Sequence, residues 1–452
     1  MADDPAARAA ARTAVRTRIL APDVARGLAL LGIAWANIST GWALADPGAP
    51  GAYFGGIRDG NMLDEVIVVL SAMFAHVRGL PMFTVLLGFG VGLITMSLSR
   101  RMYPPKHARR VLLRRYGLLA LFGVVHLVLL FYGDVLLQYG ALAMTVALMI
   151  TLRDKTLLWI GGVLIGLSTL FGLVNAVAVM FMDLGDAAGL GAWLPEFSGY
   201  VHYLGFNASM LAVVVLSLPA VAMSLLPLVI LGFVAARRGV HRNPRAYARH
   251  LWAWVWVAVA IIVFVGLPWG LSTIGVLPTA WEPLFSGING AVGYWTGPGI
   301  AAAVLLACQP LQEKIHAAQK AGETVSLPWP LQALTALGKR SFSAYILQSV
   351  LFVVLVLPFT LDLTDGAGAT GYFLIALGVW VVSLLAAWLL EAAGQPGPVE
   401  RLHRRLSYGK DGLQDPWVPE EVRGARRLQP RHEVEEHGAE QHEMKERPDK
   451  RD

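Results

Sequence analysis

The sequence predicts an all-α membrane protein, a polytopic bundle of about ten transmembrane helices with both termini in the cytoplasm. Of its 452 residues, 56% are apolar and 15% are charged, and the mean hydropathy is +0.55. This composition is too apolar for a soluble globule. Apolar runs long enough to cross a hydrocarbon core of roughly 30 Å recur along most of the chain. Lys and Arg gather in alternate loops, as expected for a multi-pass protein.

Apolar runs and loop charges together place the spans and orient them. Loops 99–116 and 236–250 are rich in arginine, whereas loops 183–206 and 276–286 contain no Lys or Arg. The positive-inside rule therefore puts both termini and the basic loops in the cytoplasm. Without a small-residue cleavage site, the first apolar run is interpreted as a permanent helix and not as a signal peptide. The expected helices lie near 27–44, 81–98, 117–132, 134–152, 156–182, 208–235, 251–275, 287–308, 342–358 and 371–391.

Segment 62–77 is ambiguous because Asp64, Glu65 and His76 interrupt its apolar residues, and Pro81 begins a new helix soon after it. We expect a helix that lies at the outer surface. If this segment crossed the membrane separately, every later loop would change sides and the charge pattern would fail.

The chain divides into a basic cytoplasmic tail over 1–17, a membrane domain over 18–410 and a charged tail over 411–452. The C-terminal tail has too few apolar residues to fold alone and is expected to be disordered. Its histidines, His432, His437 and His442, recur every five residues and so rotate around a helix, which makes a metal site improbable.

Two further residue types limit the interpretation. Cys308 is the only cysteine, so no intrachain disulfide forms. Three tryptophans follow the basic loop 236–250: Trp252, Trp254 and Trp256. Indole rings favour the headgroup region of a membrane, so we interpret these residues as membrane anchors in preference to ligand-binding residues.

A histidine in the middle of an apolar span is the best indication of function. His126 lies in the run 117–132, and Gly133-Asp134 follows directly. A tight turn there makes an antiparallel helical hairpin with His126 near mid-depth. An imidazole in hydrocarbon loses its water, so a partner, a cavity or a reaction must compensate. A satisfied core histidine and a catalytic histidine both fit.

Charged and polar residues near the expected cytoplasmic boundary form a second group. Asp23 and Arg26 are three apart and can pair on one helical face. Asn37 lies about 15 Å deeper, where its amide needs a partner in another helix or in an active site. Four arginines crowd the start of the third helix and either anchor the topology or hold phosphates of a nucleotide-bearing donor. They are Arg109, Arg110, Arg114 and Arg115.

A third group opens the ninth span. Ser341, Tyr345 and Gln348 stand at i, i+4 and i+7, so three hydrogen-bonding side chains share one helical face. Such a stripe faces protein or water, and it either joins helices or lines a substrate tunnel. Further along, Glu400 and Arg404 are four apart in a segment that surface anchoring suffices to explain.

In order and spacing, these patches resemble the bacterial YeiB family of integral membrane proteins over about residues 18–410. The resemblance rests on Asp23-Val-Ala-Arg26-Gly27 with Asn37, Phe83 to Gly90, Gly123-Val-Val-His126 with Gly133-Asp134, Gly338-Lys-Arg340 with Tyr345 and Gln348-Ser349, and Gly397-Pro398-Val-Glu400 to Tyr408-Gly409. Pro22 replaces the leucine usual before the aspartate, and Ser407 replaces the usual threonine.

The YeiB family in turn is similar to transmembrane acyltransferases that include heparan-alpha-glucosaminide N-acetyltransferase. This similarity rests on Arg26-Gly27 to Asn37 and on Leu80-Pro81-Met-Phe83 running into Gly88. It implies an acyl group, by analogy acetyl, moved from cytoplasmic acyl-CoA to an acceptor on the other face with a histidine as base. No histidine stands where that relative places its own, so His126 is the first candidate and His76 the second.

The resemblance therefore implies an acyltransferase-like domain over 18–410 in the bacterial inner membrane. His126 would take a proton from the acceptor, with His76 and Asp134 as further catalytic candidates. Asn37 or Tyr345 would stabilise the oxyanion, and Ser341, Tyr345 and Gln348 would line the substrate path. The expected phosphate-binding residues are Arg26, Arg110, Arg114, Arg115 and Arg340.

The expected partners are acyl-CoA as donor substrate, membrane lipids and a glycan or lipid acceptor, with no metal and no nucleic acid; a homodimer is left open. The alternative is a secondary or proton-coupled transporter in which His126 and Asp134 relay protons or bind substrate. Mixed polar residues fit it equally well, and the lack of an evident inverted repeat counts modestly against it. A scaffold without turnover is the third interpretation.

Overall fold

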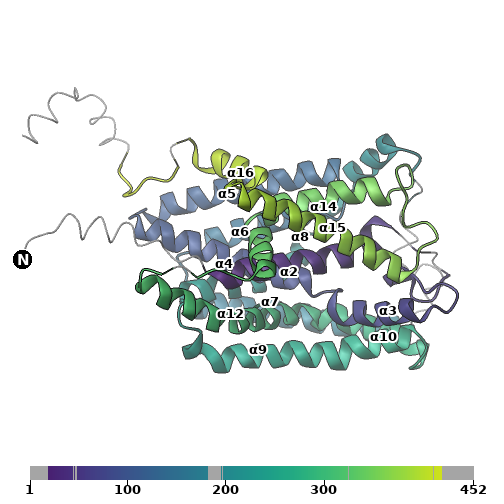
Figure 1. Ribbon diagram of the computed structural model, residues 1–452. Helices are drawn as coiled ribbons and strands as arrows, with labels where there is room; N and C mark the ends of the chain where they lie inside the picture. The colour runs from purple at the N-terminus through teal and green to yellow at the C-terminus, as the bar shows by residue number, and fades with distance from the viewer. Residues whose placement is uncertain are drawn as a thin grey trace, which may run out of the picture.

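The computed structural model describes residues 19–43, 45, 48–181, 195, 197–323, 325–410 and 412–419, and every regular element in these ranges is helical. The long helices run side by side in one bundle (Figure 1), so the all-helical class is confirmed. The α-helices are α2 (Leu20–Asn37), α3 (Met62–Phe74), α4 (Gly79–Arg100), α5 (Pro105–Leu129), α6 (Leu136–Leu148), α7 (Asp154–Val179), α8 (Tyr200–Arg237), α9 (Ala248–Ile261), α10 (Leu267–Thr273), α11 (Glu282–Val292), α12 (Thr296–Lys320), α13 (Trp329–Lys339), α14 (Ser341–Val356), α15 (Ala369–Ala392) and α16 (Pro398–Tyr408).

Several of these helices are long and apolar enough to cross a membrane, which confirms a multi-pass membrane protein. Seven segments of the described chain qualify, or eight if α13 and α14 form one span bent by 88°. α2, with 18 residues, and α6, with 13, are not among the seven. The expected number of about ten crossings needs both of them and stays a prediction.

Segment 62–77 differs from the expected surface helix. α3 continues into α4, and the two form one apolar segment of 39 residues that runs along the bundle (Figure 1). The charge of Asp64 was a reason to expect this segment at the surface, yet Asp64 is only 2% exposed. Its burial is possible because its carboxylate accepts hydrogen bonds from the backbone N–H groups of Arg58, at 3.1 Å, and of Thr370, at 2.8 Å. If this 39-residue segment makes a single crossing, the predicted alternation of loop charges is preserved.

Glycines let the central helices approach closely. A Cβ on Gly88 of α4 would lie 1.9 Å from Val229 O of α8, and one on Gly232 of α8 would lie 2.0 Å from Val85 O of α4. Small residues of this kind allow backbones to pack where no hydrophobic effect drives helices together. The α4–α8 pair therefore forms the centre of the bundle, with Phe233 fully buried in the core.

The predicted basic loops gather at one end of the bundle, which we call the basic end. It contains the starts of α2, α5, α7 and α9, the ends of α4, α8 and α12, and α16 (Figure 1, left). Polar contacts connect these helices: Leu20 N donates to Gln312 Oε1 at 2.8 Å, and Arg238 Nε donates to Asp154 Oδ2 at 2.9 Å. That this end faces the cytoplasm follows from the positive-inside rule and stays a prediction.

The first described residues of the charged tail, 412–419, contact the bundle. Arg101 O accepts the N–H of Trp417 at 2.9 Å, and the Trp417 ring lies 4.8 Å from that of His107. Residues 412–419 are thus packed on the loop between α4 and α5. The tail 1–17, residues 420–452 and the three tail histidines lie outside the described residues.

Candidate functional site

His126, near the end of α5, is the middle member of a hydrogen-bonded chain of three polar side chains. Its Nδ1 lies 2.8 Å from Asp134 Oδ1, and its Nε2 lies 2.8 Å from Ser349 Oγ on α14. The side chains of His126 and Asp134 are 1% and 0% exposed, and Ser349 is 3% exposed. A carboxylate, an imidazole and a hydroxyl thus lie in line inside the membrane domain.

The hydrogen-bonding capacity of each group fixes the direction of the chain. An ionised carboxylate only accepts, so Asp134 receives the Nδ1–H of His126. This leaves Nε2 as an acceptor for the Ser349 hydroxyl, whose other neighbour, Tyr345 O, is farther away at 3.3 Å. The order carboxylate, imidazole, hydroxyl is the arrangement that activates a serine nucleophile, although full pairing is also what a purely structural histidine requires.

The hairpin between α5 and α6 holds His126 and Asp134 together. Asp134 Oδ2 accepts the N–H of Leu137 at 2.8 Å and so caps the first turn of α6. Gly123 lets this turn approach α5, because a Cβ there would lie 2.1 Å from Leu137 N. The structure therefore has the predicted hairpin, and its aspartate serves both the helix start and the histidine.

The predicted polar stripe on α14 is extended by one turn. Ser341, Tyr345 and Ser349 stand at i, i+4 and i+8, and the Tyr345 ring centroid lies 5.0 Å from that of His126. Gln348 Nε2 and the Tyr345 hydroxyl are buried without an acceptor for their hydrogens, while the backbone N–H of Val135, a donor, approaches the Tyr345 oxygen. Buried donors without an acceptor mark a place where a ligand or water fits.

A cavity of about 290 Å³ leads from the basic end to Tyr345. Tyr345 lines the cavity, whereas His126, Asp134 and Ser349 do not, so the Tyr345 ring separates the chain of three from the space. The lining residues are Arg26, Leu30, Ile33, Phe83, Leu87, Gly90, Ile94, Arg115, Tyr116, Leu119, Val135, Leu136, Tyr139, Gly338, Lys339, Ser341, Phe342, Tyr345, Glu400 and His403.

Three cations and one carboxylate line this cavity. Arg26 is 3.5 Å from Asp23, and Lys339 is 2.5 Å from Glu391, so both are partly neutralised. Glu400 accepts hydrogen bonds from the backbone N–H groups of Phe342 and Ser343 and from the Ser343 hydroxyl. Its negative charge therefore interacts with the positive N-terminal end of α14. Arg115 is the cation there without a carboxylate partner in the described chain, which leaves the cavity electropositive.

Helix α16 closes one side of the cavity mouth. His403 Nε2 donates to Arg115 O at 2.9 Å, and the Arg115 guanidinium lies over the Tyr408 ring at 5.3 Å. Burial and the positive charge of Arg115 lower the pKa of His403 to about 4, so its imidazole is neutral at physiological pH. These two contacts, a neutral hydrogen bond and a cation over an aromatic ring, attach α16 together with the Glu400 hydrogen bonds to α14.

The predicted phosphate-binding arginines separate into two groups. Arg26 and Arg115 line the cavity, whereas Arg110 and Arg114 are exposed, and Arg114 donates to Leu406 O of α16 at 2.7 Å. Arg340 is buried beneath the bend between α13 and α14, where it donates to Gln395 O and to Glu391. Arg340 therefore joins helices, and the neighbouring Lys339 lines the cavity in its place.

Asn37 and His76 are not brought to His126. Asn37 is half-buried at the far end of α2, and its side chain has no hydrogen bond to any described residue. His76 lies between α3 and α4 in a box of aromatic rings, 4.8 Å from Tyr53, 4.9 Å from Phe54 and 6.0 Å from Trp269. Its Nε2 is buried without a partner in the described chain.

Arg78, next to this box, is a feature that the sequence analysis did not identify. It is 2% exposed and donates to Met73 O, Val77 O, Ala72 O and Asn289 Oδ1, all neutral oxygens. Three helix interruptions meet around it: the break between α3 and α4, where Arg78 itself lies, the one at Gly266 before α10, and the one at Gly293 after α11. A Cβ built on Gly266 would lie 3.2 Å from the Arg78 guanidinium, and one on Gly293 would lie 3.1 Å from it. The sequence does contain a signal for this feature, because Arg78 is a charged residue between the apolar segments 62–77 and 81–98.

Ser349 and Lys339 are the other residues that sequence reasoning did not assign. Ser349 follows Tyr345 by four positions and so shares the predicted stripe, which is a usable signal. Lys339 precedes Arg340, and only the bend between α13 and α14 decides which of the two reaches the cavity. No group of His, Cys, Asp and Glu in the described residues could hold a metal ion.

Comparison with protein-family models gives a match over part of the chain. Residues 235–410 match the model of a family described as "Protein of unknown function (DUF418)". The matched region includes α14 with Ser349 and Tyr345, whereas His126 and Asp134 precede it. No curated protein matches the chain.

Proposed function

We propose that this chain, whose residues 235–410 belong to the DUF418 family, is an integral membrane acyltransferase that uses Ser349, His126 and Asp134. The proposal extends the expectation of a histidine base by assigning the nucleophile to Ser349. One observation carries it: a serine hydroxyl, an imidazole and a carboxylate are hydrogen-bonded in series at 2.8 Å, next to an electropositive cavity.

Acyl-CoA is the proposed donor because the cavity combines cations at its mouth with an apolar interior. Arg26, Arg115 and Lys339 would pair with phosphates at the basic end. Leu30, Phe83 and other apolar side chains farther in would contact the pantetheine arm. The thioester would then reach Tyr345, whose ring must swing aside to admit it to Ser349.

The proposed chemistry has two balanced halves. In the first, Ser349 Oγ bonds to the thioester carbonyl carbon and its proton passes to His126 Nε2; the C–S bond then breaks, and the sulfur takes that proton to leave as free CoA thiol. In the second, an acceptor O–H or N–H gives its proton to Nε2 and attacks the acyl carbon. The C–Oγ bond breaks, and Oγ recovers the proton.

Asp134 and the unpaired donors of α14 would support both halves. Asp134 holds the Nδ1–H tautomer and stabilises the imidazolium that forms on His126. The Tyr345 hydroxyl and Gln348 Nε2 have hydrogens available for the oxyanion, a contribution of about 3 kcal/mol per donor where the geometry is good. Of the two oxyanion donors expected from the sequence, Asn37 and Tyr345, the tyrosine is the one beside His126.

The acceptor would be a glycan or lipid hydroxyl or amine that arrives from the opposite end, in the inner membrane of a bacterium. On that side Trp42 stacks on Phe131 at 4.3 Å and lies 5.4 Å from Phe352, one turn after Ser349 on α14. In the proposed mechanism this aromatic cluster would stand between the opposite end and Ser349. Acceptor entry therefore requires it to open.

Radiolabelled acetyl-CoA tests the proposal with the full-length protein in lipid nanodiscs. We expect CoA thiol release and a covalent acyl group on Ser349, observed by peptide mass spectrometry in a Cys308→Ser background that removes the chain's own thiol. Ser349→Ala abolishes both signals, whereas Ser383→Ala, at a buried serine of α15 bonded only to Val379 O, retains them.

Two results would contradict the proposal. If Ser349→Ala keeps thiol release that His126→Ala loses, the nucleophile is wrong and His126 activates the acceptor directly. If acetyl-CoA neither binds nor reacts, and replacing Arg115 and Lys339 by Gln changes nothing, the acyltransferase assignment is wrong.

A secondary transporter is the second candidate, and the surroundings of Arg78 favour it. Interrupted helices that meet at a buried charge are typical of carrier binding sites. Arg78 has no carboxylate partner among the described residues and would attract an anionic substrate. Coenzyme-independent uptake into proteoliposomes that is lost in Arg78→Gln but kept in Ser349→Ala would select the carrier.

A further inference from the structure

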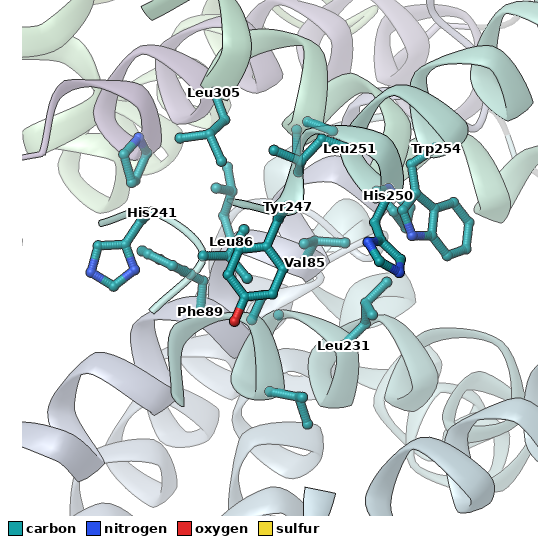
Figure 2. A pocket seen from close by; sticks show the side chains of 18 of the residues that line it. Val85, Leu86, Phe89, Leu231, His241, Tyr247, His250, Leu251, Trp254 and Leu305 are labelled. Carbon is teal, nitrogen blue, oxygen red and sulfur yellow. The ribbon is translucent and has the colours of Figure 1, made fainter. Parts of the chain in front are cut away.

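A second cavity, of about 310 Å³, lies at the basic end on the other side of α4. Its walls are apolar side chains of α2, α4, α7, α8, α9 and α12, among them Leu86, Phe89, Leu251 and Leu305 (Figure 2). α8 and α9 are consecutive helices, but α8 packs on α4 and α7, and α9 packs on α12. The cavity occupies the space between these two diverging helices.

Few polar residues line this cavity, and none of its lining residues is acidic. They are Arg238, His241, Tyr247 and His250, and His241 and His250 lie on opposite sides of the space (Figure 2). Trp254 turns inward to line the cavity, whereas Trp252 and Trp256, on the other face of α9, are 51% and 64% exposed. The expectation of anchoring therefore suits Trp252 and Trp256, and Trp254 has a different place.

A smaller polar cavity of about 90 Å³ adjoins the apolar one, and the two share Ala21, His241 and Leu305 as walls. Arg242 and Arg245 line it, together with Gln309, Gln312, His316 and Glu313. Glu313 is engaged by Arg245 at 2.7 Å and by Gln309 at 2.9 Å. Arg242 has no carboxylate partner in the described chain, so the polar cavity retains a free positive charge.

His241 joins the two cavities and has unused hydrogen-bonding capacity. It is 8% exposed, and its Nδ1 is buried without a partner among the described residues. Burial, with the positive charges of Arg242 and Arg100, lowers the pKa of His241 to about 4, so the imidazole is neutral at physiological pH. It can therefore offer a hydrogen bond at the boundary between apolar and polar space, where an ester or phosphate oxygen of an amphiphile would lie.

We propose that the paired cavities bind one anionic phospholipid, with an acyl chain in the apolar cavity and the phosphate beside Arg242 in the polar one. The apolar volume is at the lower end of the range of about 300–1,000 Å³ for small-molecule sites, which suits part of an acyl chain. Five arginines occur between 237 and 250, and among the described residues only Asp154 and Glu313 pair with them. This excess of positive charge favours an anionic headgroup over a zwitterionic one.

Native mass spectrometry of the full-length protein released from nanodiscs tests this site. With phosphatidylglycerol and phosphatidylcholine in equal amounts, we expect one retained phosphatidylglycerol per chain. Arg242→Gln should lower its retention about fivefold. Arg249→Gln is the matched control, because Arg249 is exposed on the same segment and lines neither cavity.

A second pair of variants tests the apolar cavity. Ala302→Phe fills it from α12 and should reduce lipid retention, whereas Ala307→Phe, at an exposed position of the same helix, should not. If Ala302→Phe fails to fold, the exposed Arg242 still decides the question. Equal retention of the two lipids by the unaltered protein, retention of free phosphate or fatty acid in place of a phospholipid, or an unchanged lipid count in Arg242→Gln would overturn the proposal.

Discussion

His126 shows how much a single buried polar group reveals before its partners are known. Its position in an apolar run predicted that something must compensate for lost hydration, and Asp134 and Ser349 do so at 2.8 Å each. Because both nitrogens are paired, burial alone does not distinguish a structural from a catalytic histidine. The unpaired donors on Tyr345 and Gln348 are the features that favour a reaction.

Asp134→Asn tests the tautomer without changing the size of the side chain. An asparagine can present its N–H₂ to Nδ1, so the imidazole proton moves to Nε2 and that atom no longer accepts the Ser349 proton. We expect acyl transfer, measured as CoA thiol release, to fall by about 10⁴-fold. The melting temperature should change little, because the remaining carbonyl oxygen can still accept Leu137 N.

The control for this substitution is Asp365→Asn, at an exposed acid in the loop before α15. It should leave both transfer and melting unchanged. Activity of Asp134→Asn within tenfold of the unaltered protein would mean that the carboxylate does not orient the imidazole for reaction.

Among the helices, the α4–α8 pair is the most sensitive to a small change in volume. A Cβ on Gly88 would meet Val229 O at 1.9 Å, and backbone on both sides leaves no flexible atom to yield. We therefore expect Gly88→Ala to separate the pair and to destabilise the protein by several kcal/mol, seen as a lower melting temperature in detergent.

Gly162→Ala provides the comparison for that effect. Gly162 lies in α7, and a Cβ there would meet nothing within 4 Å. This change should be neutral or stabilise the helix by up to about 1 kcal/mol, because alanine has the higher helix propensity. Equal melting temperatures for the two variants would show that α4 and α8 do not pack as closely as described.

Helix α16 should detach in acid because of His403. Its folded pKa of about 4 is below the ordinary 6.5, so between these values the detached form binds a proton that the packed form does not. The contribution of His403 to the free energy of attaching α16 is therefore fully present above pH 6.5. It decreases as the pH falls towards 4, by about 3 kcal/mol at most. Hydrogen exchange of 398–408 at several pH values measures this loss.

His403→Gln removes the titrating group and keeps an N–H donor for Arg115 O. Exchange of α16 in this variant should depend much less on pH. If His403→Gln shows the same acid response as the unaltered protein, another group controls the attachment of α16.

For the chain as a whole, orientation is the property with the widest consequences. The cavity that we propose for the donor and the proposed lipid site both have lining residues at the basic end, so cytoplasmic acyl-CoA could reach the first only if that end faces the cytoplasm. The alternation of basic and neutral loops predicts this orientation, and the helix order of the bundle is compatible with it.

Cysteine labelling tests the orientation directly, since Cys308 is the only native cysteine. In a Cys308→Ser background, Arg242→Cys at the basic end should react with a membrane-impermeant maleimide only after cells are opened. Val276→Cys, 67% exposed at the opposite end, should react in intact cells. The reverse pattern would invert the bundle and exclude a cytoplasmic donor for the cavity at Tyr345.

Composition and local sequence pattern were enough to predict the fold class of the protein and about half of the candidate site. An apolar chain with few charges must satisfy its backbone within helices, so the helical bundle follows from hydropathy alone. His126 and Asp134 are only eight positions apart across a tight turn that the sequence predicts, and the stripe on α14 follows from helical periodicity.

The remaining half depended on contacts between distant segments. Ser349 is 223 residues from its partner His126, and nothing local to either residue indicates the other. Close packing likewise decided that Asp64 could be buried in α3, that Lys339 and not Arg340 faces the cavity, and that His76 and Asn37 lie apart from His126. Each outcome depends on which helix faces occupy the same space, and that is a property of side-chain volumes packed across the whole bundle, not of any one stretch of chain.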